Sequence, residues 1–218
     1  MSFYVELQQA TQAEQARLQA IPIINAALQG QVTRAQYVAF LTQAYHHVKH
    51  TVPLLMACGA RLDGDKEWLR TDIAHYIEEE IGHQEWILND IRACGGDSEA
   101  VRHGMPSAQT ELMVSYAYDT IARVNPLGFF GMVFVLEGTS TQLATQAAAK
   151  IQAALALPQQ AFTYLTSHGE LDLEHLHFYA NLVNRLESAA DRNCIIHRAK
   201  MFFRLYGDIF RSLQEVPA

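Results

Sequence analysis

Helical periodicity runs through this chain and sets its fold class. Apolar residues recur three and four positions apart from one Pro or Gly to the next, and no alternating run of Val, Ile and Thr bounded by hairpin turns is found. Thr33 stands where an N-cap would open a helix over about 34–61, in which Pro53 predicts a kink or a break. The sequence therefore predicts one all-α domain of about seven helices over residues 1–218.

The same signals place the other helices. Gly95-Gly96 should end the second long helix, Ser107 and Pro126 should open the next two, and Pro158 should precede the helix that follows. The first thirty residues are expected to hold one or two shorter helices. The expected ranges are therefore about 66–93, 107–124, 126–157, 158 onward and 188–213.

Composition excludes several classes of function. The formal net charge of -7 and the absence of a basic patch argue against a nucleic-acid partner. The longest apolar run, 126–136, is too short to span a bilayer, and the first residues do not resemble a signal peptide. Three widely spaced cysteines form no metal or redox motif. We therefore expect a cytoplasmic protein with no membrane partner.

The segment 168–175 carries the most specific functional pattern. His168, Asp172 and His175 are spaced i, i+4, i+7, so in a helix they lie on one stripe. Imidazole and carboxylate groups are ligands for iron and manganese. Glu170 and Glu174 show that the segment is also polar, so a solvated face is the alternative. Metal ligation is the favoured interpretation of this stripe.

Two more stretches offer metal ligands. Glu80 and His83 are spaced i, i+3, although their position in a run of three glutamates is also typical of a solvated face, and Glu79 with His83 is a competing pair. Glu137 follows eight mostly large apolar residues and has no Lys or Arg three or four positions away. A buried carboxylate without a counter-charge costs several kcal/mol, which a bound metal would offset.

A cluster of histidines at 46–50 allows two interpretations, a functional role and an ordinary structural one. His47 and His50 are spaced i, i+3 and could be ligands or line a pocket, and His46 is adjacent. Ordinary polar-core and surface histidines on a helix are the favoured reading for these three. The candidate ligands outside this cluster, namely Glu80 with His83, Glu137 and the stripe in 168–175, fall on three separate predicted helices. Di-iron carboxylate sites in helical bundles are built in this way.

The chain resembles the heme-oxygenase-like di-iron oxidases, also called iron-containing redox enzymes, which are relatives of the thiaminase II (TenA) and pyrroloquinoline-quinone synthase folds. The likeness rests on the spacing His-x3-Asp-x2-His, on the Glu-x2-His pair and on the further Glu of a middle helix. It implies a seven-helix bundle, two ferrous ions with the second weakly held, and O2 as cosubstrate. The implied metal ligands are Glu80, His83, Glu137, His168, Asp172 and His175.

The resemblance implies oxidation of a small molecule of amino-acid, amine or fatty-acid type. Tyr164, one turn before His168, would lie near the metals and is the catalytic candidate, since some relatives convert one of their own tyrosines. The pocket wall is expected from Phe129, Phe130, Phe134 and Tyr164, with Tyr45 as a further candidate.

Related branches of the fold suggest alternative functions. The thiaminase branch uses a cysteine nucleophile, and the quinone-synthase branch needs no metal, so a metal-free enzyme of this fold or a ligand-binding bundle is the alternative function. The expected partner is a small-molecule substrate, and a homodimer is left open.

Overall fold

The computed structural model describes the backbone of residues 1–216 and the side chains of residues 1–138, 144–167, 176–214 and 216. The described backbone contains α-helices, short 3-10 turns and one π-helical segment, with no strand, which confirms the all-α prediction. It has eleven α-helices where about seven were expected. They are α1 Phe3–Gln19, α2 Pro22–Leu28, α3 Arg34–Val48, α4 Thr51–Ala60, α5 Glu67–Glu80, α6 His83–Ala93, α7 Ser98–His103, α8 Ala108–Asp119, α9 Phe130–Leu155, α10 Thr163–Asn184 and α11 Ala189–Ser212.

Two of the extra helices arise because long predicted helices are divided. The helix expected over 34–61 breaks at residues 49–50, upstream of Pro53, which lies in the first turn of α4. Proline lacks an N–H and its ring clashes with the carbonyl four residues earlier, so the break falls near Lys49. The helix expected over 66–93 breaks at Gly82, whose φ of 97° lies in the left-handed region that favours glycine.

The starts of α3, α8 and α11 agree with the sequence, and each is capped by a side chain. Thr33 and Gln36 form a capping box, in which the Thr33 hydroxyl accepts from the Gln36 N–H at 3.1 Å. Ser107 caps α8 and Ser188 caps α11, each by accepting an N–H three residues on. These local hydrogen bonds explain why the starts of α3, α8 and α11 could be predicted.

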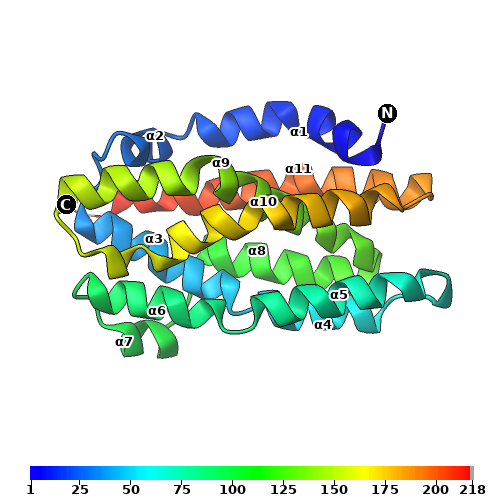
Figure 1. The fold of residues 1–218 in the computed structure, drawn as a ribbon, viewed down its shortest axis with the longest axis horizontal. Coiled ribbons are helices and arrows are strands. Elements are labelled where there is room, and N and C mark those ends of the chain that lie inside the picture. The colour runs from blue at the N-terminus through cyan, green and yellow to red at the C-terminus, as the bar shows by residue number, and fades with distance from the viewer. Residues whose placement is uncertain (217–218) are drawn as a thin grey trace.

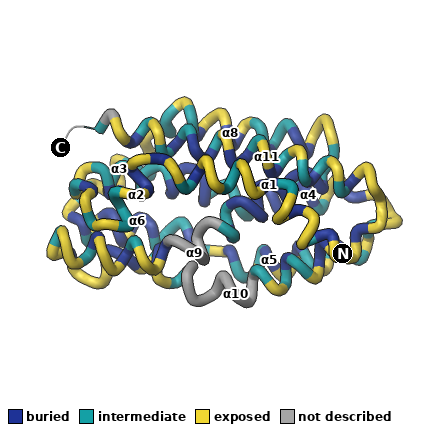
Figure 2. Tube along the Cα trace, turned by 90° about the horizontal axis from the view of Figure 1, so that it is seen from above, coloured by how far each residue is buried: buried dark blue, intermediate teal, exposed yellow. Residues whose placement is uncertain are grey.

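Helices α9, α10 and α11 lie side by side along the long axis of the molecule (Figure 1). Helix α1 packs on α10 and α11, while α3 contacts both α6 and α8. A Cβ on Gly131 would lie only 2.6 Å from the backbone nitrogen of Ala199, so the α9 and α11 backbones approach closely there. Buried residues gather on the sides of the helices that face one another (Figure 2). The core is therefore continuous along the bundle.

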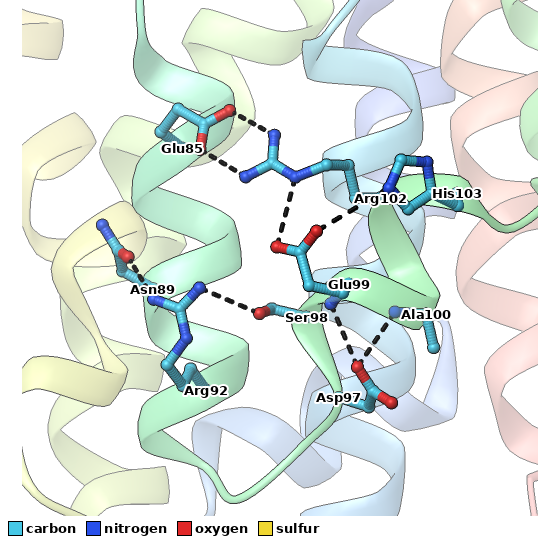
Figure 3. A network of polar contacts seen from close by, with 9 residues as sticks. All are labelled: Glu85, Asn89, Arg92, Asp97, Ser98, Glu99, Ala100, Arg102 and His103. Carbon is cyan, nitrogen blue, oxygen red and sulfur yellow. Dashed lines mark hydrogen bonds and ion pairs between the residues drawn. The ribbon is translucent and has the colours of Figure 1, made fainter.

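Helix α7 is short and was not predicted from the sequence. Hydrogen bonds and ion pairs connect it to α6 (Figure 3). Arg102 donates two hydrogen bonds of 2.8 Å to the Glu85 carboxylate and a third to Glu99. Asp97 caps the helix by accepting from the N–H groups of Glu99 and Ala100. In the described part of the chain, no helix is long and apolar enough to cross a membrane.

Candidate metal centre

Two buried carboxylates from different helices line one cavity inside the bundle. Glu80 stands at the C-terminal end of α5 and Glu137 on α9, with 6% and 9% of their surfaces exposed. The space between these side chains measures about 680 Å³, part of it open to solvent. Its other described polar lining groups are His47, Thr51, Tyr76, Tyr164 and Tyr206, and its described apolar lining residues are Val48, Leu54, Leu55, Phe129, Met132, Val133 and Leu136.

Glu80 and His83 meet across the helix break rather than along one helix. The left-handed Gly82 ends the α5 direction, and His83 begins α6. The His83 Nδ1 lies 3.1 Å from a Glu80 carboxylate oxygen, and the ring stacks on Trp86 with centroids 4.1 Å apart. His83 is buried, and the Glu80 carboxylate that it contacts lines the cavity. A carboxylate in this position can be a metal ligand or can orient the imidazole as one.

Glu79 is more exposed than Glu80 and contacts a different histidine. Its carboxylate lies 3.2 Å from His75 Nε2, and 34% of its side chain is exposed. The inward-facing carboxylate of the glutamate run is therefore Glu80, and Glu79 does not line the cavity.

Tyr76 lies near both acids of the cavity. Burial raises the pKa of its phenol well above the usual value, and the negative charges of Glu137 and Glu80 raise it further. The Tyr76 hydroxyl therefore remains protonated at neutral pH.

The histidines of α3 and its C-terminal junction divide in their roles. His47 lines the cavity and contacts Tyr206 edge to face, with ring centroids 5.9 Å apart. His46 is buried outside the cavity beside Lys49, and burial lowers the pKa of His46 to about 4. His50 lies 3.1 Å from the Tyr118 hydroxyl. The favoured reading of ordinary structural histidines fits His46 and His50, whereas His47 belongs to the cavity.

Asp90 is a buried residue that holds α10 in place and that the sequence did not reveal. This fully buried carboxylate on α6 accepts from the backbone N–H groups of Thr163 and Tyr164, at 3.1 and 2.8 Å, and from the Thr163 hydroxyl. It therefore caps the start of α10 from outside that helix and fixes the residue Tyr164. Burial raises the pKa of Asp90 to about 6, although the hydrogen bonds from Thr163 and Tyr164 act in the opposite direction. Its partners are more than seventy positions away, so no local motif marks it.

The expected pocket wall is correct in part. Phe129 and Tyr164 line the cavity. Phe130 and Phe134 do not, because both pack against Tyr179 on α10. Tyr45 also lies elsewhere, beneath the Lys49 ammonium, which is 5.2 Å from its ring centroid. The Phe-rich run is therefore divided between cavity and core, with Phe129 at the N-cap of α9 on the cavity side.

The sequence matches the family described as iron-containing redox enzyme over residues 38–207, most of the chain. This chain belongs to the iron-containing redox enzyme family. No significant match was found among curated proteins.

Solved structures show that this family member has the heme-oxygenase-like fold. A domain of unknown function with that fold from Shewanella denitrificans OS217 is 23% identical, with a TM-score of 0.85 over 95% of this chain and 90% of that one. Heme oxygenase-1 from the cyanobacterium Synechocystis sp. PCC6803, solved with heme, is 14% identical, with a TM-score of 0.78 over 98% and 93%. A TenA homologue from Pseudomonas syringae pv. tomato DC3000 is 11% identical, with a TM-score of 0.79 over 96% and 91%.

The chemistry of the donors described in this iron-containing redox enzyme suits iron. Glu80, Glu137 and His83 bring two carboxylates and one imidazole to the same region. Among the residues with described side chains, no three His, Cys, Asp or Glu groups are arranged so that they could hold a metal ion. His168, Asp172 and His175 fall within the span of α10, and their side chains lie outside the described residues.

Proposed function

We propose that this chain is a non-heme, iron-dependent oxidoreductase that uses O2 to oxidise a small molecule. The observation that supports this most is the approach of two buried carboxylates, from α5 and α9, to one cavity with His47 and Tyr76 on its wall. Membership of the iron-containing redox enzyme family supports the same function. Two carboxylates buried together favour a bound cation, which would offset the cost of taking their charges out of water.

The proposed ligands of two irons are Glu80, His83 and Glu137 together with His168, Asp172 and His175. The first three come from α5, α6 and α9, and the other three belong to the sequence of α10. Helix α10 packs against both α9 and α6, so the backbone brings the two halves of the set to neighbouring helices. When bound, iron would supply the site for O2 and the electrons for its reduction.

The residues of the cavity have roles of their own. The apolar wall formed by Leu54, Phe129 and Met132 limits the entry of water, which strengthens interactions between charges inside. The Tyr76 phenol, kept protonated beside Glu137 and Glu80, borders the space in which a substrate would bind. Tyr164, whose backbone is held by Asp90, is the proposed catalytic tyrosine at the wall.

A metal-free enzyme of the same fold is the competing proposal, since TenA homologues share this architecture. A cysteine nucleophile of the thiaminase kind is poorly supported. Burial raises the pKa of Cys58 to about 12 and that of Cys94 to about 11, so neither thiol ionises readily at neutral pH. None of Cys58, Cys94 and Cys194 lines the cavity that holds Glu80 and Glu137.

Oxygen uptake tests the proposed function. Chelator-treated protein is loaded anaerobically with ferrous iron, freed of unbound metal and mixed with a known amount of O2. We expect uptake that scales with bound iron and that falls when Glu137 is replaced by Gln. Equal uptake by the iron-loaded and iron-free proteins would overturn the proposal.

A further inference from the structure

A second cavity lies beside the first and differs from it in chemistry. It runs between α2, α3, α9, α10 and α11 and encloses about 850 Å³, part of it open to solvent. Ile24, Phe40, Ile151, Leu165 and Phe210 contribute to its wall. No charged residue is among its described lining residues, whereas the first cavity has Glu80 and Glu137.

Two of the polar groups on this wall are already engaged with the protein. The Gln36 side-chain oxygen accepts from the Thr33 N–H at 3.0 Å as part of the capping box. The Tyr37 hydroxyl donates to the Ala161 carbonyl at 2.8 Å. The cavity therefore offers contact area and dispersion more than hydrogen bonds, which suits hydrocarbon.

Two tyrosines border both cavities. Tyr164 on α10 and Tyr206 on α11 appear in the lining of the carboxylate cavity and of the apolar one. The ring centroid of Tyr206 lies 5.9 Å from that of His47, which lines the carboxylate cavity, and 4.9 Å from that of Phe210, which lines the apolar one. One end of a molecule in the apolar cavity would thus contact Tyr164 and Tyr206. Glu80 and Glu137 line the cavity on the other side of these two tyrosines.

We propose that the apolar cavity binds the hydrocarbon tail of an amphipathic substrate, whose polar head lies beyond Tyr164 and Tyr206 at the carboxylates. The position of the reacting head rests on the proposed iron-dependent function, but binding of the tail does not. The proposal narrows the substrate class to molecules with an elongated apolar portion, as opposed to small, wholly polar amino acids.

Small residues keep this space open. Ala27 on α2 and Ala144 and Ala147 on α9 line the cavity, and each leaves room that a larger apolar side chain would fill. Empty apolar space costs stability, because the lining atoms lose contacts. A cavity that is only a packing defect would therefore be improved by a filling substitution, whereas a binding cavity would lose its ligand.

Calorimetric titration of the full chain with straight-chain carboxylates and straight-chain amines of increasing length tests the proposal. Affinity should rise about 4-fold per added methylene until the cavity is full, as expected for burying each group. In Ala147→Phe the affinity should fall at least ~10-fold for the longer chains, as the ring takes their place. The control Ala149→Phe, an exposed position on the same helix, should bind as the wild type does.

Ala27→Leu provides a second filling variant, from the facing helix, should Ala147→Phe unfold. Affinity independent of chain length, or wild-type affinity in a folded filling variant, would overturn the proposal.

Further titrations, with and without ferrous iron, distinguish a carboxylate head from an amine head and test the tail independently of the iron centre. A gain for carboxylates on ferrous loading would place the head on the metal, whereas a gain for amines without iron would place it on Glu80 and Glu137. Glu137→Gln should lose iron and retain the dependence of affinity on chain length. If the wild type binds no iron but shows that dependence, the proposed function fails and the inference about the tail stands.

Discussion

Glu137 illustrates what a single position can reveal. The apolar run before it, and the lack of a cation within one turn, predicted a buried carboxylate, and Glu137 is buried and lines the cavity. The sequence could not choose among His46, His47 and His50 in the same way. Their selection depends on which side of α3 meets Tyr206 of α11, and that contact joins residues far apart in the chain.

Replacing Glu137 by Gln tests its role as a ligand. The change keeps the shape and removes the charge, so iron affinity should fall at least ~10–100-fold, the usual cost of disturbing even the surroundings of a metal ligand. Iron would be quantified by mass spectrometry after anaerobic loading. Glu78→Gln is the matched control, because Glu78 is an exposed residue of the same glutamate run and should keep wild-type iron. Wild-type iron in Glu137→Gln would show that Glu137 is not a ligand.

At the scale of the helix, Gly82 positions the Glu80–His83 pair. Its φ of 97° is strained for any residue with a Cβ, although a Cβ there would meet nothing within 4 Å. Gly82→Ala should therefore destabilise the fold by about 1 kcal/mol through the backbone alone. Urea unfolding measures the change. Gly64→Ala is the control, since that position is equally open and has no positive φ; equal stability of the two variants would contradict the backbone argument.

The cap on α10 gives a second prediction at this scale. Asp90→Ala removes the acceptor for the N–H groups of Thr163 and Tyr164, so the variant should be about 1–2 kcal/mol less stable at mildly acidic pH. Asp208→Ala breaks only an exposed pair with Arg211 and should change stability by less than ~0.5 kcal/mol. Chemical denaturation of both variants and the wild type provides the comparison. Similar losses for the two would mean that Asp90 is not an effective cap.

The pH dependence of that loss follows from the raised pKa of Asp90. The folded-state pKa of about 6 exceeds the value of ~4 expected in the unfolded chain, so the folded protein holds the proton more tightly. The stabilisation from this group is fully present below pH ~4 and is lost as the pH rises through about 6. The advantage of the wild type over Asp90→Ala should therefore shrink between these pH values, and an advantage that grows with pH would contradict the assignment.

For the whole molecule, local chemistry predicted the fold class and several helix starts, but it could not place every break or the cavities. Thr33, Ser107 and Ser188 are self-contained caps, so the sequence around each is sufficient. The break at Gly82 was not predicted because an isolated Gly is tolerated in a helix. The i, i+3 spacing of Glu80 and His83 is also compatible with an uninterrupted helix. The two cavities depend on the packing of five or more helices, which no local pattern encodes.

The central claim is that this family member holds two irons between α5, α6, α9 and α10. Metal analysis after anaerobic ferrous loading, on the wild type and on His175→Ala, tests it most directly. We expect up to two irons per wild-type chain, and a loss of iron in His175→Ala with unchanged helical circular dichroism, because the described core consists of apolar residues of many helices. Wild-type iron content in His175→Ala would remove that residue from the ligand set, and a wild-type protein that binds no iron would contradict the account.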